Sequence, residues 1–275
     1  MKAKRIRKVI VALLLLALLL IILTPLLWTI VLSFDRAALT SLPKFSLIPK
    51  EPSLFNYQAA AKLINLKKYY TNTATVTIIN TVISVFFALT CGYAFAKGKF
   101  VFKRFWFYFM LAVMMIPFES RMIPLFLQYK KWGMLDTYAP LILGNFAYIY
   151  GIFFARQSIA TIPDSLRESA YLDGAGEWRI FFRIIIPLSK PVIATLSILQ
   201  IIANWNSYLW PLVVIRSSAK QMISVGVALF NAQETSIYYG PRMAVAVLSA
   251  IPLTIMFLFL QKYIVQSIAV SGIKQ

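Results

Sequence analysis

Two carboxylates, Glu168 and Asp173, are candidates for chemistry because they lie in a charged segment of a chain that is 60% hydrophobic and only 13% charged. Exposed carboxylates are suited to binding a basic surface of another protein. We expect Glu168 in the first turn of a short helix, where the helix dipole favours a carboxylate, and Asp173 near the end, where the dipole disfavours one. Asp173 should therefore have a cationic partner, which is either an arginine of another subunit or one of this chain: Arg167, Arg179 or Arg183.

The helix that would present these carboxylates has recognisable start and stop signals. Residues 163–165, Pro-Asp-Ser, predict a helix start with an N-cap, while Gly174 and Gly176 tolerate the positive φ of a helix end. The pattern predicts a helix from about Ser165 to Asp173. The alternative is that residues 161–183 are a solvated amphipathic loop between two membrane spans, and spacing alone does not decide between the two.

The residues of the common catalytic sites are missing from the sequence. The chain has no histidine, which excludes imidazole acid–base catalysis, HExxH zinc chemistry and a Ser-His dyad. No P-loop occurs, because Gly98-Lys99 is followed by Phe100. We therefore expect a non-catalytic chain without a cofactor or metal of its own. The aspartates fall in loops or at span ends, which argues against an intramembrane aspartyl protease: Asp35, Asp136, Asp164 and Asp173.

Two groups of polar residues are candidates for a substrate path. Glu119 and Arg121 lie between Pro117 and Pro124, and a helix interrupted by two prolines frees backbone carbonyls near the midplane of a membrane. The alternative for these charges is a structural ion pair. A second, aromatic group suits sugar stacking, although an interfacial belt or contact with a binding protein is the favoured explanation for it: Asn204, Trp205, Asn206 and Tyr208.

The elements that must position these residues are membrane helices. A mean hydropathy of +0.75 over 275 residues leaves too few polar groups to coat a water-soluble domain. Each span needs roughly 20 apolar residues, so we expect one all-α domain, residues 1–275, with six transmembrane helices. The uncharged run from Val9 to Phe34 is too long for the h-region of a signal peptide, so we expect its retention. The predicted spans are about 9–34, 72–96, 105–127, 138–160, 184–204 and 243–265.

Positive charge predicts the orientation of these spans. Lys and Arg residues crowd the first eight positions and residues 97–104, which places those segments, both termini and residues 161–183 in the cytoplasm. The net charge of +19 does not indicate nucleic-acid binding, because the basic residues are scattered without a nucleic-acid motif. Anionic membrane lipids are the expected counterpart. Cys91 is the single cysteine, which we expect to be an inert residue of the core.

Residues 168–187 resemble a family motif. Glu168-Ser169-Ala170, Gly174 and the Ile184–Pro187 stretch are similar to the EAA motif of permease subunits of binding-protein-dependent ABC importers, with Ser169 and Ile186 as the two departures. The resemblance implies the type I importer permease fold, in which the loop between the fourth and fifth spans forms a coupling helix that enters a cleft of the ATPase subunit. On this resemblance we expect the ATPase-coupling residues to be Glu168, Ser169, Ala170, Asp173, Gly174 and Pro187.

The resemblance extends to the carbohydrate branch of that family, over residues 114–126, 162–175, 205–212 and 259–275, although Ser267 and residues 271–275 depart from the usual tail. It implies a multi-pass subunit in a bacterial or archaeal cytoplasmic membrane. The implied partners are a second homologous permease, two ATPase subunits carrying ATP and Mg²⁺, and an extracytoplasmic solute-binding protein. Glu119-Ser120-Arg121 is similar to glycerol-3-phosphate permeases, so that substrate is an alternative to a sugar. The alternative class is a stand-alone secondary carrier or a membrane scaffold.

Overall fold

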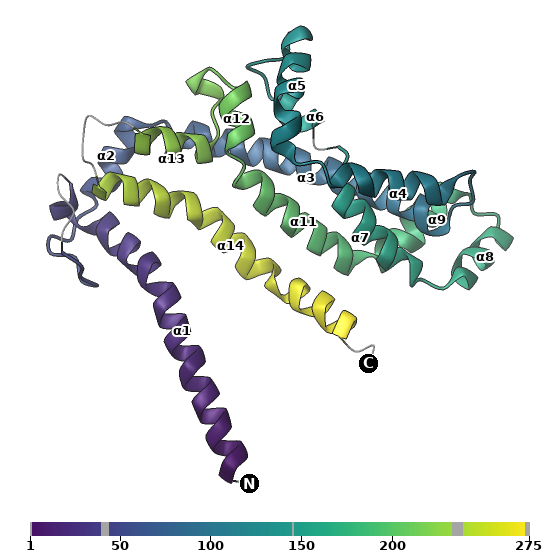
Figure 1. Ribbon diagram of the computed structural model, residues 1–275, viewed down its shortest axis with the longest axis horizontal. Helices are drawn as coiled ribbons and strands as arrows, with labels where there is room; N and C mark the ends of the chain where they lie inside the picture. Colours follow the sequence, from purple (N-terminus) through teal and green to yellow (C-terminus); the bar gives the residue numbers. More distant parts are fainter. Residues whose placement is uncertain (1, 40–43, 145, 233–238, 273–275) are drawn as a thin grey trace. The chain divides into compact units, whose positions relative to one another are not determined.

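The computed structural model describes residues 2–39, 44–144, 146–232 and 239–272, and the chain in these ranges is helical (Figure 1). The predicted all-α class is confirmed. The chain divides into two compact units, Met1–Leu66 with Gly226–Pro252 and Lys67–Val225 with Leu253–Gln275. The assignment of residues 1–275 to a single domain remains a prediction.

The helices in chain order are α1 (Lys2–Phe34), α2 (Phe55–Leu63), α3 (Leu66–Lys97), α4 (Lys103–Met114), α5 (Phe118–Lys131), α6 (Ala139–Leu143), α7 (Ile149–Ala160), α8 (Asp164–Leu172), α9 (Glu177–Ile180), α10 (Ile186–Leu188), α11 (Lys190–Trp205), α12 (Leu209–Val214), α13 (Ile223–Ala232) and α14 (Tyr239–Gly272). A π-helical turn, η2 (Phe181–Ile185), joins α9 to α10. Two short 3₁₀ turns are η1 (Arg36–Ala38) and η3 (Ser218–Lys220).

Three unbroken helices are long and apolar enough to cross a membrane, in the segments Ile6–Phe34, Leu66–Lys97 and Tyr239–Phe259. They contain all or most of the predicted spans 9–34, 72–96 and 243–265. Two bent pairs raise the count of possible spans to five, so the structure does not confirm six. The predicted span 138–160 is divided between α6 and α7, and a helix of 12 residues reaches about 18 Å, against about 30 Å of hydrocarbon.

The two bent pairs have prolines at their breaks. α4 and α5 meet at an angle of 94°, with Pro117 as the N-cap of α5; the predicted interruption of the span 105–127 is confirmed. The segments Glu177–Leu188 and Lys190–Trp205 meet at 78°. Pro187 and Pro191 flank this second bend and cannot donate the backbone hydrogen bonds that would continue one straight helix.

The first unit is fastened by one buried amide. Asn56 of α2 donates from Nδ2 to the carbonyls of Leu32 (3.2 Å) and Asp35 (2.8 Å), which ties α2 to the end of α1. Gly240 leaves room for this amide, because a Cβ there would lie 2.3 Å from Asn56 Nδ2. Along α1 the leucines of residues 13–20 are exposed, as expected of side chains that face lipid.

The second unit holds two apolar cores. One lies where α3, α7, η2 and α11 meet and includes the buried residues Leu89, Ile159, Ile185 and Leu196. The other gathers around Trp210 of α12 with residues of α3, α5 and α6. Gly92 lets α3 approach α7 closely, since a Cβ there would lie 2.7 Å from that of Ala155. Cys91 packs against the first core, as predicted.

Candidate coupling site

Helix α8 presents the predicted docking segment. It runs from Asp164 to Leu172, so the predicted helix is confirmed to within one residue at each end. Two details of the prediction were wrong. Pro163 is the N-cap and no side chain caps the helix, whereas Asp164 already lies in the first turn. Glu168 therefore lies in the second turn, where the helix dipole stabilises a carboxylate much less.

The end of α8 is a Schellman motif. The N–H of Ala175 donates to the carbonyl of Ala170 (2.9 Å) and that of Gly174 to the carbonyl of Tyr171 (3.0 Å). Gly174 has φ +75, which confirms the positive φ predicted there. Gly176 has φ −76 and begins α9 as its N-cap, so Gly174 is the one of the two candidate glycines that ends the helix.

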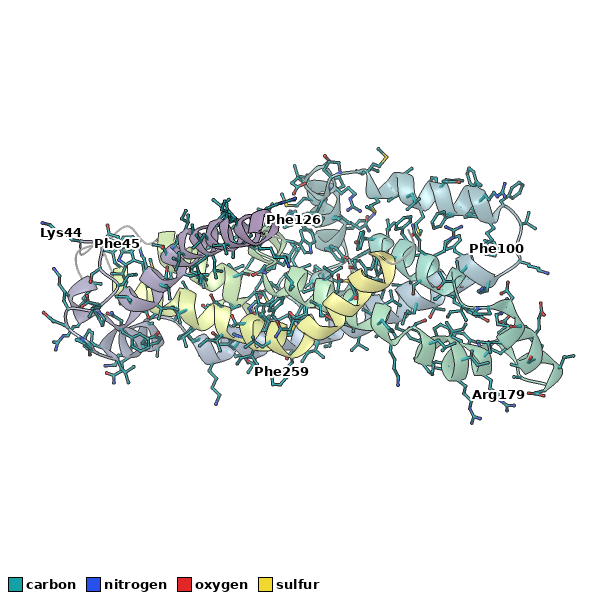
Figure 2. The ribbon with its side chains drawn as sticks, turned by 90° about the horizontal axis from the view of Figure 1, so that it is seen from below. Lys44, Phe45, Phe100, Phe126, Arg179 and Phe259 are labelled. Atoms are coloured by element: carbon teal, nitrogen blue, oxygen red, sulfur yellow. The ribbon has the colours of Figure 1, made fainter. Side chains whose placement is uncertain are left out.

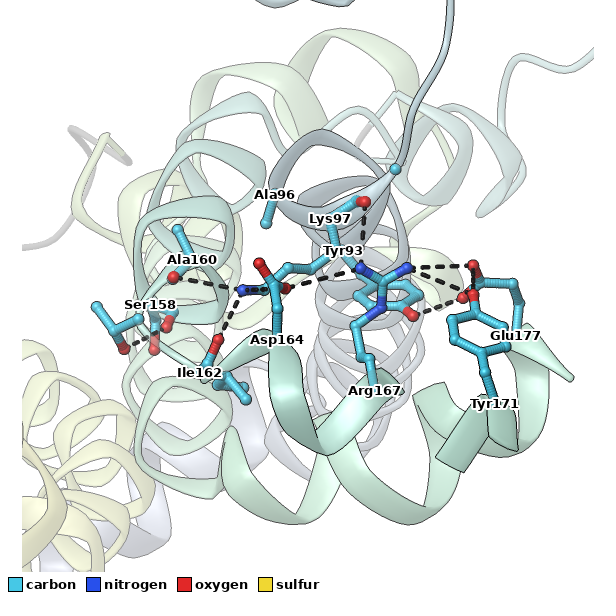
Figure 3. A network of polar contacts seen from close by, with 12 residues as sticks. Tyr93, Ala96, Lys97, Ser158, Ala160, Ile162, Asp164, Arg167, Tyr171 and Glu177 are labelled. Atoms are coloured by element: carbon cyan, nitrogen blue, oxygen red, sulfur yellow. Dashed lines mark hydrogen bonds and ion pairs between the residues drawn. The ribbon is translucent and has the colours of Figure 1, made fainter. Parts of the chain in front are cut away.

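Lys97, the last residue of α3, anchors the start of α8 (Figure 3). Its Nζ lies 2.9 Å from Asp164 Oδ1 and donates to the carbonyl of Ile162 at 2.6 Å. The Lys97 side chain is only 6% exposed, so this ammonium has exchanged most of its water for protein acceptors. The ammonium also lowers the pKa of the Asp164 carboxyl below its ordinary value of 3.8.

Arg167 makes the second anchor, on the same face of α8 (Figure 3). Its Nη1 donates to the carbonyl of Lys97 (3.4 Å) and lies 3.7 Å from Asp164 Oδ1, while Nη2 lies 3.4 Å from Glu177 Oε1. Glu177, the first residue of α9, also accepts hydrogen bonds from the hydroxyls of Tyr93 (2.5 Å) and Tyr171. The polar network therefore fixes α8 to α3 and to α9.

The outer face of α8 is exposed. Glu168, Ser169 and Asp173 are exposed, and Leu172 is 90% exposed. Among the described residues no hydrogen bond or ion pair reaches the carboxylate of Glu168 or of Asp173. Ala170 differs, since it packs against the apolar core beneath the helix. The geometry separates an anchored inner face from an exposed outer face.

The three arginines expected near Asp173 are engaged elsewhere or point away. Arg167 turns to Asp164 and Glu177. Arg179 is exposed and projects away from the helices (Figure 2), and Arg183 is also exposed. Within the described residues none of them pairs with Asp173, so the alternative of an arginine from another subunit is the one that stays a prediction. Pro187 lies 13 residues beyond Gly174, at the 78° bend and outside the exposed face of α8.

Sequence reasoning missed the residues that hold α8 in place. From spacing alone Lys97 and Asp164 indicate only a positive charge and a helix start, and Tyr93 and Glu177 carry no recognisable signal. The available signal was the acidic pair that brackets α8, Asp164 and Glu177, because carboxylates in a segment flanked by basic residues can form ion pairs with them. Among the described residues no group of three or more cysteine, aspartate or glutamate side chains is arranged to hold a metal ion.

The substrate-path candidates of α5 are separated by the structure. Arg121 lines a cavity of about 290 Å³, together with the aromatic residues Phe118, Tyr129, Tyr150 and Trp210. Glu119 is exposed and does not line it. Neither charge forms an ion pair within the described residues, so the alternative of a structural pair between them and a neighbouring helix is not observed.

Of the four candidates at the end of α11, two pack between helices and two are exposed. Asn204 Oδ1 accepts a hydrogen bond from Nδ2 of Asn80 (3.0 Å), which joins α11 to a buried polar stripe of α3. Trp205 is buried and lies 6.1 Å, between ring centroids, from Tyr70. Asn206 and Tyr208 are exposed, with Asn206 Nδ2 donating back to the carbonyl of Ile202 (3.0 Å). Two of the four side chains thus serve packing between helices.

Relatives with known names match over most of the chain. The arabinooligosaccharides transport system permease protein of Halalkalibacterium halodurans is 35% identical over 206 residues, 75% of this chain and 74% of the relative. The sn-glycerol-3-phosphate transport system permease protein of Brucella abortus is 29% identical over 264 residues, 93% of this chain and 94% of the relative. A solved structure, that of a bacterial ABC transporter involved in the import of the acidic polysaccharide alginate, matches with a TM-score of 0.84 and 26% identity over 96% of this chain and 98% of that chain.

The family assignment rests on the larger part of the sequence, including α8 and both bent pairs. Residues 84–270 match the family described as binding-protein-dependent transport system inner membrane component. Several apolar helices fit a multi-pass membrane protein, and membership implies a solute-binding protein and an ATPase as partners. The chain belongs to the binding-protein-dependent transport system inner membrane components, and it is a permease of the ABC importer type.

Proposed function

We propose that this chain is a permease subunit for a carbohydrate and that α8 is its docking site for an ATPase subunit. The observation that carries the coupling role is the outer face of α8, where Glu168, Leu172 and Asp173 are exposed and neither carboxylate forms an ion pair within the described residues. A solvated loop would need no such anchoring, whereas a helix that transmits force must be held rigidly on its inner face. The ion pairs of Lys97 and Arg167 supply that rigidity.

The complete transporter would contain this chain, a second homologous permease, two ATPase subunits and a solute-binding protein. ATP and Mg²⁺ belong to the ATPase subunits, and this chain carries out no chemical step of its own. ATP-driven closure of the ATPases draws the docked helices together. α8 is hydrogen-bonded to α3 and joined through α9 and η2 to α11. Its displacement therefore rotates the membrane helices and opens the cavity beside Arg121 to the outside. Both chain termini and α8 then lie on the cytoplasmic side.

A carbohydrate is supported by the relatives and by the cavity beside Arg121. Relatives named for arabinooligosaccharides and for lactose are 35% and 30% identical to this chain. Aromatic side chains line the cavity together with one arginine, and aromatic faces with few polar groups are typical of ligand pockets. We propose Arg121 as a substrate contact, whereas Asn206 and Tyr208 are suited to contact with the binding protein.

The second candidate substrate is glycerol-3-phosphate or a related phosphorylated polyol. It is favoured by the relative of that name and by Arg121, which lines the cavity and forms no ion pair within the described residues, since arginine is a strong phosphate ligand. We expect Arg121→Gln to reduce uptake of the phosphorylated solute by more than tenfold and of a neutral sugar by less. An equal loss of uptake for both solutes would contradict binding of the phosphate group by Arg121.

The docking role is tested by binding of the ATPase subunit to the purified permease complex. Glu168→Gln removes one charged partner, so we expect the ATPase to bind roughly tenfold or more weakly, because a hydrogen bond to a charged group contributes about 1.5–3 kcal/mol. Glu51→Gln, an exposed carboxylate of the other unit, is the matched control. Wild-type binding by Glu168→Gln, or a permease that purifies from intact cells without any ATPase, would favour the stand-alone class.

A further inference from the structure

A second cavity, of about 450 Å³, lies at the end of α3 and contains no residue of α8 in its lining. Three of its six lining residues are cations, namely Lys103, Arg104 and Arg156, and the other three are the aromatic residues Phe95, Phe107 and Tyr108. Phe95 comes from α3, Arg156 from α7, and the other four residues from the first turns of α4, which packs against α7 (Figure 1). We call this cavity the basic pocket.

Two of the three cations are held in place by protein contacts. The guanidinium carbon of Arg156 lies 4.1 Å from the centroid of the Phe107 ring, and Arg156 Nε donates to the carbonyl of Phe95 (3.4 Å). Lys103 Nζ donates to the carbonyls of Ala96 (3.2 Å) and Gly98 (2.9 Å). These contacts fix the positive charges before any ligand arrives, which lowers the entropic cost of binding one.

Within the described part of the chain, no carboxylate neutralises the basic pocket. Its lining contains no acidic residue, and the two acids of the adjacent network, Asp164 and Glu177, are paired with Lys97 and Arg167. Within the described residues no ion pair includes Lys103, Arg104 or Arg156. Three cations gathered at one cavity repel one another, so an anion bound between them would relieve that repulsion.

The surroundings of the basic pocket are those of a membrane interface. α4 is the first half of a bent pair apolar enough to cross the membrane, and four of its exposed side chains are aromatic: Phe105, Trp106, Tyr108 and Phe109. Exposed aromatic residues beside basic ones mark the level of the lipid headgroups. A soluble anion would need no apolar surface next to its charge, whereas a lipid needs both.

We propose that the basic pocket binds the phosphate of an anionic phospholipid, with Arg104 and Arg156 as its main ligands and the acyl chains on the exposed aromatic face of α4. The site does not depend on the docking of an ATPase. It would place a negatively charged lipid beside Lys97, at the anchor of α8.

Lipid binding to the purified full-length chain tests this proposal. Phosphatidylglycerol and phosphatidylcholine with identical acyl chains are titrated and bound lipids counted by native mass spectrometry. Each removed charge should weaken phosphatidylglycerol about fivefold, so Arg104→Gln/Arg156→Gln should weaken it about 25-fold, with phosphatidylcholine unchanged. Lys130→Gln/Lys131→Gln, an exposed pair at the end of α5, is the control and should bind like the wild type.

Three results would overturn the proposal. The first is equal phosphatidylglycerol binding by the wild type and Arg104→Gln/Arg156→Gln. The second is displacement of the lipid by millimolar inorganic phosphate, which would indicate a site for a soluble anion. The third guards against misfolding, because Arg156 also contacts Phe107 and Phe95: the exposed single variant Arg104→Gln must itself show a loss of about fivefold, and unchanged binding there contradicts the assignment.

Discussion

Gly174 determines the shape of the exposed end of α8. Its φ of +75 allows the Schellman hydrogen bonds that turn the chain from α8 toward α9. A Cβ at this position would meet no atom within 4 Å, so a side chain there is opposed by backbone conformation and not by a steric clash. The EAA-type glycine therefore has a conformational explanation that does not require contact with a partner.

Substitution of Gly174 should follow backbone preference and not side-chain volume. Gly174→Ala costs about 1–2 kcal/mol in the left-handed region, so we expect ATPase binding to fall by roughly five- to thirtyfold. Gly174→Asn is bulkier yet tolerates this φ, and it should retain most of the binding. Gly133→Ala is the matched control, since Gly133 has φ +68 and equally open surroundings; a loss of ATPase binding in that variant equal to Gly174→Ala would contradict a local role.

The bounds of α8 could be predicted from the sequence because its start and stop signals are local. Its anchors could not, because Arg167 bonds a carbonyl 70 positions away and Tyr93 bonds a carboxylate 84 positions away. Likewise, nothing adjacent to Asn204 in sequence indicates that its amide meets Asn80 of α3. Contacts between distant segments depend on the tertiary packing, which spacing along one segment does not encode.

At the scale of elements, α8 is a helix held on one face by two largely covered cations and exposed on the other. Lys97 and Arg167 have side chains 6% and 15% exposed, and both bridge α8 to neighbouring segments. Mutations in the anchor and in the docking face should therefore have different effects on the position of α8. Loss of the anchor should loosen the helix, whereas loss of Glu168 should leave it in place.

Removing the Lys97 ammonium should expose Arg167 to protease. We expect tryptic cleavage after Arg167 to be several times faster in Lys97→Gln and in Asp164→Asn, measured as the rate of appearance of the fragment that ends at Arg167. Lys99→Gln is the control, since Lys99 is exposed and makes no ion pair within the described residues. Unchanged cleavage in Lys97→Gln would show that the ion pair does not hold α8.

The pH dependence of this anchor follows from the lowered pKa of Asp164. The stability contributed by a carboxyl whose pKa is lowered in the folded state is present above its unfolded value, here 3.8, and is lost as the pH falls through the lower folded value. The cleavage rate after Arg167, corrected for the protease itself, should therefore be constant between pH 5 and 8. A rise in that rate between pH 7 and 5 would contradict the assigned ion pair.

The number of spans illustrates why element type is easier to predict than element count. Composition alone predicts that the chain is helical and lies in a membrane, and Pro117 indicates the break before α5. The bend angles and the division of residues 138–160 into α6 and α7 depend instead on how the short helices pack on α3 and α11. A window of 20 apolar residues is satisfied equally by one straight span and by two short helices.

At the scale of the whole molecule, membership of the permease family implies that transport requires partner subunits. The relatives are transport-system permeases, and we propose that ATP hydrolysis by a separate ATPase subunit drives transport through the cavity beside Arg121. We propose that α8, α9, η2, the bend at Pro187 and α11 connect the ATPase to that cavity. On this proposal the outer face of α8 contacts an ATPase.

Site-specific cross-linking tests that claim most directly. In a Cys91→Ser background, Leu172→Cys places a thiol-reactive photo-cross-linker on the 90% exposed position of α8, and Glu51→Cys places it on the other unit. In membranes containing the assembled transporter, Leu172→Cys should yield an adduct with a polypeptide that mass spectrometry identifies by its P-loop sequence, and Glu51→Cys should not. Absence of that adduct from Leu172→Cys, or equal yields from both positions, would contradict the assignment of α8 as the coupling helix.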